Sequence, residues 1–161
     1  MDEDLPRAAQ LTQKTNQFNL TTRRYTEQDL QGFQKSADSA VYIASVSDKF
    51  GDNGKTFLAI LKKAPPDTAE VDTFLMSCRV MGRFIEDQIL DHLVRELRQQ
   101  NVAKLRLHFF PTKKNMPARA MLDRLKGKIV SQEENGNTTW EYDLTQGSSV
   151  MQPAYAELMP R

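Results

Sequence analysis

The sequence predicts an α/β (α+β) domain in which one mixed central sheet carries helices on both faces. Two observations support this class. Apolar or alternating runs typical of strands recur between segments with helical spacing, and a long hairpin precedes a strand–helix–strand unit. A chain of 161 residues is also long enough to bury a sizeable core as one domain.

The first half of the chain predicts a strand, a helix and the hairpin. Residues 18–25 alternate apolar and polar side chains, as a short strand does. Thr26 resembles the first residue of a capping box, so a helix should follow it and end near Lys35. Residues 41–62 predict the hairpin, with its turn at 51–54, because Asn-Gly supplies the positive φ values of a tight turn.

The second half predicts the strand–helix–strand unit and a closing pair of strands. Residues 85–99 place Ile85, Ile89, Leu93 and Leu97 on one helical face, with charges on the other. The remaining predicted elements are strands at 70–78, 104–110, 129–130 and 139–144 and a helix at 115–125 that Gly127 terminates.

Composition narrows the class of protein. The net charge of +1 provides no basic field for nucleic acid, and no apolar run has membrane-spanning length. The acidic start, Met1-Asp2-Glu3-Asp4, is unlike a secretory signal, and a single cysteine forms no internal disulfide, so we expect a cytoplasmic protein. Cys78, His92 and His108 lack zinc-ligand spacing, and no metal is expected.

Residues 1–19 are polar and predict a leader or linker ahead of a domain at 20–161. The alternative is a docked functional segment, for which Leu11 and Phe18 could serve as anchors.

The most informative segment is Cys78-Arg79-Val80-Met81-Gly82-Arg83-Phe84, between a strand and the long helix. Backbone N–H groups and the helix dipole converge at such a junction and favour an anion. The same field favours a thiolate on Cys78, which makes that residue a candidate nucleophile. The alternatives without a functional role are a buried core cysteine and a solvated turn with surface arginines.

This order of elements, with an Arg-x-x-Gly loop after a central strand, resembles the GNAT acyltransferase fold. The phosphate loop of that family reads Gln/Arg-x-x-Gly-x-Gly/Ala, and Arg79 and Gly82 match it, whereas Phe84 replaces the final small residue. The resemblance implies that CoA or a carrier-protein phosphopantetheine contacts this loop. The implied cofactor-binding residues are Arg79, Val80, Met81, Gly82, Arg83, Phe84 and, later in the chain, Asn115.

A later signature of the same family is Asn, then Ala three residues on, then Gly. Asn115, Ala118 and Gly127 fit that spacing. The position that often holds a tyrosine general acid in that family is Leu122, so the usual proton donor to the leaving thiolate is absent. Acyl transfer through a thioester on Cys78 would account for a transferase without that tyrosine.

Four longer strings resemble the C-terminal domain of FkbH-like proteins: residues 10–25, 48–54, 77–83 and 111–115. That resemblance implies transfer of a glyceryl-like acyl unit from a phosphorylated glycerate to an acyl carrier protein. It also implies a haloacid-dehalogenase-like phosphatase domain as partner. The magnesium-binding Asp-x-Asp strand end of such a domain is not found in this chain.

The function that follows is acyl transfer to or from a phosphopantetheine thiol. The thiol arm would lie in a wedge between the strands ending near Cys78 and Phe109, bound by their free backbone groups. Two alternatives stay open: a non-catalytic module that docks a carrier protein or the phosphatase domain, and an acetyl-CoA-dependent N-acetyltransferase. Secondary candidates are His92 or His108 as base, Asn16, Gln17, Asn19 and Arg23 as lining, and Asp48, Asp52 and Asn53 as a turn rather than a chelating loop.

Overall fold

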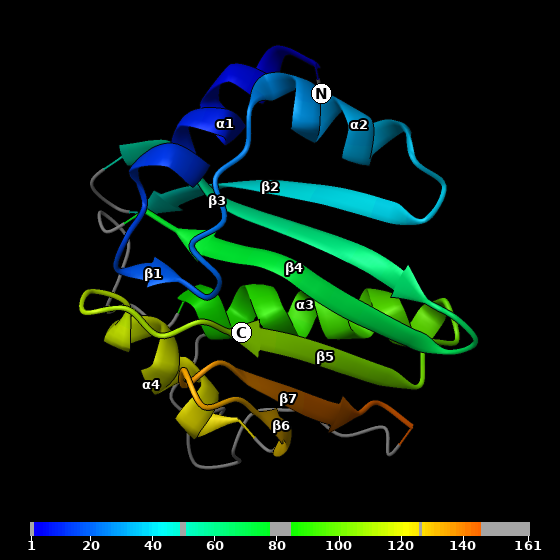
Figure 1. Cartoon of the computed structure of the whole chain (residues 1–161). Helices are drawn as coiled ribbons and strands as arrows, with labels where there is room; N and C mark the ends of the chain where they lie inside the picture. The colour runs from blue at the N-terminus through cyan, green and yellow to red at the C-terminus, as the bar shows by residue number, and fades with distance from the viewer. Residues whose placement is uncertain (1, 49–50, 78–84, 126, 146–161) are drawn as a thin grey trace.

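One mixed sheet forms the centre of the protein. The structure is a computed structural model that describes residues 2–48, 51–77, 85–125 and 127–145. Its strands run antiparallel except for the parallel pair β4 and β5 (Figure 1). Their order is β2 (Ser39–Asp48), β3 (Gly51–Ala64), β4 (Thr68–Met76), β5 (Lys104–Phe109), β7 (Thr138–Asp143) and β6 (Lys128–Gln132), and β1 (Phe18–Asn19) pairs with β4.

Helices cover both faces of the sheet, as the sequence predicts. α1 (Leu5–Lys14), preceded by a short 3₁₀ turn at Asp2–Asp4, and α2 (Glu27–Lys35) pack on one face, in a core cluster with Leu58, Ile60 and Leu75. α3 (Ile85–Gln99) and α4 (Met116–Arg124) pack on the other face, in the larger cluster. The alternation of side chains along each strand separates the two cores.

Two helices form for the reasons that the sequence indicates. At α2, the Thr26 hydroxyl accepts from the Asp29 N–H at 3.1 Å, and the Asp29 carboxylate accepts from the Thr26 N–H at 2.9 Å. This reciprocal capping box is confirmed. The apolar stripe of α3 is buried through Leu90, Leu93, Val94 and Leu97. Arg124 of α4 contacts Glu86 and Asp87 in the first turn of α3 and ties the two helices together.

The expected hairpin exists, but its turn is displaced. Asp48 pairs with Gly51 and Ser47 with Asp52, so the segment 51–54 belongs to β3 rather than to the turn. Gly54 does have a positive φ of 72°, and it lies where the register of β2 and β3 shifts. The Asn-Gly signal therefore marks an irregularity within a strand.

The expectation of a polar leader is corrected, because residues 5–19 are docked. Leu5, Ala8 and Leu11 are buried against α2 and β3, and Phe18 lies in the main core. The spacing of the three α1 residues gives this mostly polar segment one apolar face. The strand expected at 18–25 is only two residues long, and the chain runs on irregularly to α2.

Candidate functional site

A bulge in β4 lies next to the point at which β4 and β5 separate. Between β3 and β4 the register passes from Ile60↔Thr73 to Leu61↔Val71, which leaves Asp72 as the extra residue. The parallel pairing of β4 with β5 ends at Val71↔Leu107. Bulges re-aim side chains, and here the bulge turns Asp72 toward the face that carries α1 and α2. We call the space between the separating strands the fork.

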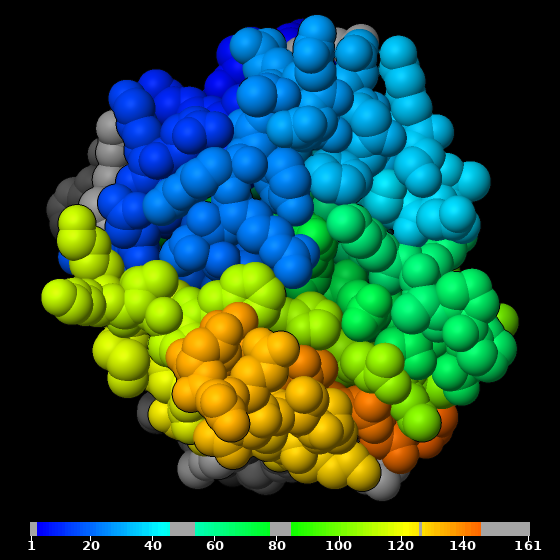
Figure 2. All heavy atoms as spheres, viewed as in Figure 1, coloured from blue at the N-terminus to red at the C-terminus, as the bar shows by residue number. Residues whose placement is uncertain are grey.

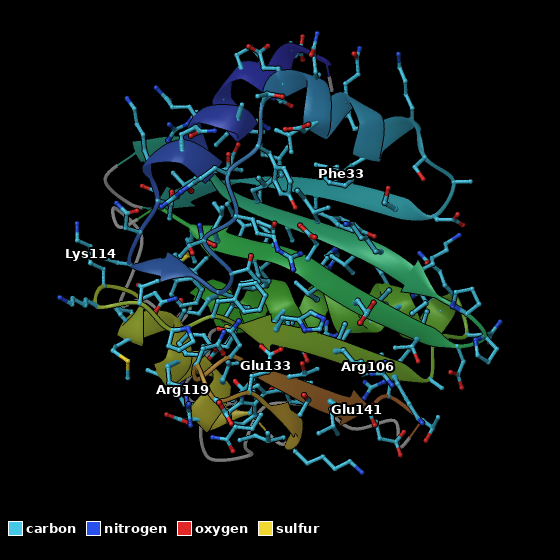
Figure 3. All side chains as sticks on the ribbon, in the orientation of Figure 1. Phe33, Arg106, Lys114, Arg119, Glu133 and Glu141 are labelled. Carbon is cyan, nitrogen blue, oxygen red and sulfur yellow. The ribbon has the colours of Figure 1, made fainter. Side chains whose placement is uncertain are left out.

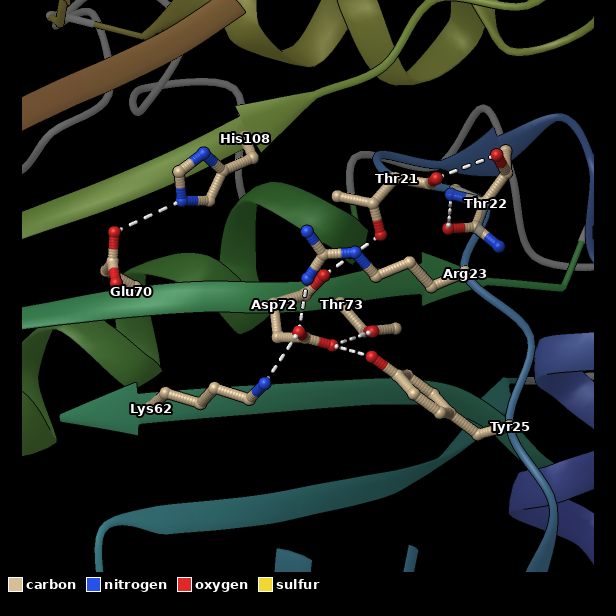
Figure 4. A network of polar contacts seen from close by, with 10 residues as sticks. Thr21, Thr22, Arg23, Tyr25, Lys62, Glu70, Asp72, Thr73 and His108 are labelled. Carbon is tan, nitrogen blue, oxygen red and sulfur yellow. Dashed lines mark hydrogen bonds and ion pairs between the residues drawn. The ribbon is translucent and has the colours of Figure 1, made fainter. Parts of the chain in front are cut away.

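Asp72 is the centre of a buried polar network (Figure 4). Its side chain is only 1% exposed. The Tyr25 hydroxyl donates to its carboxylate at 2.7 Å and the Thr73 hydroxyl at 2.9 Å. Arg23 forms an ion pair with it, and the Lys62 ammonium lies 3.2 Å away. The carboxylate thus has hydrogen-bond donors and two cations to offset its burial.

The network holds Asp72 ionised and Tyr25 protonated at neutral pH. Burial would raise the pKa of Asp72, but the hydrogen bonds from Tyr25 and Thr73 and the charges of Arg23 and Lys62 outweigh burial and lower that pKa below its ordinary value. Burial, the hydrogen bond to Asp72 and its negative charge raise the pKa of Tyr25 to about 12. Asp72 therefore stays negative and Tyr25 neutral near pH 7, and neither group exchanges a proton there.

A second polar pair on the same face is open to solvent. His108 Nε2 on β5 lies 3.3 Å from Glu70 Oε1 on β4, and His108 Nδ1 lies 3.1 Å from the Thr139 hydroxyl on β7. Glu70 is 36% exposed and His108 is 24% exposed. Arg106 and Glu141 form the next pair along these strands, at 3.1 Å (Figure 3). A carboxylate oriented by an imidazole can accept a proton from an incoming nucleophile.

The fork between β4 and β5 is filled by the chain itself (Figure 1). Phe18 and Asn19 pair with Met76 and Leu75 of β4. Leu20 then bridges the two strands: its N–H donates to the Phe74 carbonyl at 3.2 Å, and its carbonyl accepts from the Phe110 N–H at 2.9 Å. The wedge exists, but the expectation of free backbone groups along it is wrong in this structure.

Comparison with known proteins identifies the fold. No protein-family model matches the chain, and no curated protein matches it in sequence. Solved structures do match its fold. The ribosomal-protein-S18-alanine N-acetyltransferase from Escherichia coli superposes with a TM-score of 0.65 at 16% identity, covering 93% of this chain and 94% of that one. An acetyltransferase from Thermus thermophilus gives 0.66 at 14% identity, covering 89% and 92%. The GNAT domain of S. lividans PAT gives 0.65 at 17% identity, covering 88% and 85%. The chain has the GNAT acetyltransferase fold.

Asn115, expected at the cofactor, lies at the fork of this GNAT fold and is fully buried. Its side-chain N–H groups donate to the carbonyls of Asn19 at 3.1 Å and Phe110 at 2.9 Å, and its oxygen accepts from the Thr112 N–H at 2.8 Å. All three bonds are internal, and they join the segment in the fork to the end of β5. A contact between Asn115 and a cofactor stays a prediction.

Two groups of predicted site residues remain: the loop at 78–84, which the structure does not describe, and His92. Cys78, Arg79, Val80, Met81, Gly82, Arg83 and Phe84 lie outside the described residues. His92 projects from α3, on the opposite side of the sheet, and pairs with Glu96. Among the described residues, no group of three or more metal-ligating side chains occurs and no helix is long and apolar enough to cross a membrane.

Sequence reasoning missed Asp72, Glu70 and Tyr25 of this site, whereas Arg23 and His108 were among its secondary candidates. Asp72 is a lone carboxylate inside the otherwise apolar run 71–76, and that departure was the available signal. Glu70 looked like an ordinary charge at a strand end. Tyr25 and Arg23 reach Asp72 from 47 and 49 residues away, a relation that no local pattern carries.

Proposed function

We propose that this protein transfers an acyl group from the pantetheine thioester of CoA or of a carrier protein. The observation that carries the proposal is the junction of β4 and β5, where the bulge at Asp72 and the Glu70–His108 pair share one face beside the fork. The GNAT acetyltransferase fold agrees with this chemistry. A thioester bound at the fork would lie close to the Glu70–His108 pair, which can accept a proton, and to the charged groups around Asp72.

Glu70 is the proposed general base. Its carboxylate is the more exposed partner of the pair, and His108 holds it on the face where an acceptor would approach. As the acceptor attacks the thioester carbonyl, Glu70 takes the acceptor's proton, the carbon–sulfur bond breaks, and the pantetheine thiolate leaves. Asp72 keeps Arg23 and Lys62 in place but does not exchange protons.

We expect Glu70→Gln to lower kcat by about 100- to 10,000-fold, the usual contribution of a positioned base. The measurement is release of free thiol at saturating donor, with KM changing little because glutamine keeps the shape of the side chain. Glu141→Gln is the matched control, since Glu141 pairs with Arg106 on the same face. Equal losses in both variants, or none in Glu70→Gln, would rule out the assigned role.

Cys78 offers a covalent version of the same transfer. Its thiolate would displace the pantetheine thiolate and hold the acyl group as an enzyme thioester, which the acceptor then cleaves to regenerate the thiol. We expect a mass gain of one acyl group on the peptide containing Cys78 after incubation with an acyl donor, and none in Cys78→Ser. Undiminished transfer by Cys78→Ser would leave only direct transfer between bound substrates.

The finer form of the proposal is the FkbH type: a glyceryl-like unit, an acyl carrier protein as acceptor and a haloacid-dehalogenase-like phosphatase domain as partner. The four strings at 10–25, 48–54, 77–83 and 111–115 support it. An acetyl-CoA-dependent N-acetyltransferase fits the fold equally well. Release of CoA from acetyl-CoA on addition of small amines, without any carrier protein, would favour that second form.

A docking module without chemistry is the other candidate, and the filled fork favours it. Calorimetry separates the two classes of function. A docking module should bind a pantetheine-bearing carrier protein with the same affinity as the carrier protein that lacks the arm, and it should ignore CoA. A transferase should distinguish the two carrier forms.

A further inference from the structure

We infer that the chain inhibits itself: residues 18–22, here called the fork strand, occupy the place of the pantetheine arm and must leave β4 before a donor binds. The inference rests on the proposed transfer from pantetheine. Its basis is that one stretch of backbone already uses the groups that the arm would need. In the space-filling view the blue N-terminal segment covers this region and meets the yellow-green residues that follow β5 (Figure 2).

The fork strand acts as an added strand. An extended ligand binds a sheet edge through main-chain hydrogen bonds. The backbone N–H and carbonyl groups on the edge of β4 that faces β5 can pair with one such strand at a time. Asn19 pairs with Leu75, and the Leu20 N–H takes the Phe74 carbonyl. Phe18 and Leu20 also fill the space with apolar side chains that are at most 1% exposed. A pantetheine arm and the fork strand therefore exclude one another.

The fork strand is the tip of a loop whose base is fixed elsewhere. The Thr12 hydroxyl accepts from the Tyr25 N–H at 3.0 Å, which clamps α1 to the start of α2. Arg24 contacts the carbonyls of Thr12 and Thr15 at the end of α1. Because α1 and α2 pack on the sheet through a core cluster that does not include Phe18 or Leu20, the tip can detach while both helices stay in place.

The burial of Phe18 and Leu20 and a set of polar contacts hold the tip in place, and one strained residue opposes them. Asn115 bonds the Asn19 carbonyl, and the Thr21 hydroxyl donates to the Asp72 carbonyl at 2.9 Å. Thr22 has a φ of 54°, a left-handed conformation that a β-branched residue adopts at a cost. Release of the tip would relieve that strain, and an entering arm would replace the lost pairing with β4. The fork strand is thus suited to exchange with the donor.

A reversible lock tests the inference. Phe18 and Met76 face each other across β1 and β4, a spacing that suits a disulfide. Phe18→Cys with Met76→Cys, in a Cys78→Ser background, closes on oxidation and opens on reduction. We expect the oxidised protein to bind CoA at least about tenfold more weakly than the same protein after reduction. The control pair Lys104→Cys with Asp143→Cys joins β5 to β7 away from the fork and should show no difference between redox states.

The unmodified chain supplies a second measurement, in case the reduced variant folds poorly. CoA should accelerate hydrogen exchange of the Leu20 and Phe110 amides. Equal CoA affinity in both redox states would overturn the inference and leave acyl transfer standing, because the donor would then bind outside the fork. Failure of every form to bind CoA or a pantetheine-bearing carrier protein, with slow exchange at Leu20 unchanged, would overturn both the inference and the proposed function.

Discussion

Asp72→Asn lowers the free energy of unfolding by about 2–4 kcal/mol at neutral pH, less than the loss of a fully buried ion pair because Arg23 and Lys62 are partly hydrated. The amide also turns an N–H₂ group toward the hydrogen-bond donors of Tyr25 and Thr73. Urea unfolding at pH 7 measures the loss. We expect reduced transfer as well, since Arg23 and Lys62 lose the negative charge that holds them at the site.

The pH dependence of that loss has a definite sign. The pKa of Asp72 is lower in the folded protein than in the unfolded chain, where an aspartate titrates near pH 3.9. Its contribution to stability is therefore complete above about pH 4–5 and disappears as the pH falls through the lower, folded-state pKa. The difference between wild type and Asp72→Asn should shrink in acid.

Asp143→Asn is the matched control for this prediction. Hydrogen bonds from Thr145 also lower the pKa of Asp143, but that carboxylate is exposed, so water replaces the lost partners. Its substitution should change stability far less. A loss of similar size in both variants would contradict the account of Asp72 as a buried centre.

Asn115→Ala should lower stability and raise the affinity for CoA. The substitution removes three internal hydrogen bonds and leaves the carbonyls of Asn19 and Phe110 without their side-chain donor, at a cost of about 2–4 kcal/mol. The same change loosens the fork strand. Thermal unfolding and calorimetry with CoA measure the two effects.

The direction of the affinity change decides the role of Asn115. If Asn115 contacts the cofactor directly, as the resemblance to the GNAT fold implies, its removal would weaken CoA binding. If Asn115 is a latch on the fork strand, its removal strengthens binding. Asn135→Ala is the control, because the exposed Asn135 side chain accepts only from the nearby Asn137 N–H and water can replace it. Unchanged stability in Asn115→Ala would exclude the latch.

The architecture was predictable from sequence because it follows from local patterns. The apolar stripe of α3 and the capping box of α2 are each visible within a few residues, and both are confirmed. The bulge at Asp72 was not predictable, since it arises from a mismatch of register between two strands. The fork strand was missed for a related reason: the partners of Leu20 are 54 and 90 residues away, and a two-residue strand has no periodicity.

The central claim is that this site cleaves a pantetheine thioester. The most direct test is release of free thiol from acetyl-CoA and from an acyl-loaded carrier protein, each offered to the wild-type chain with and without an acceptor amine or thiol. The account predicts release above the uncatalysed rate from at least one donor, and loss of that release in Glu70→Gln. No release from either donor would contradict it.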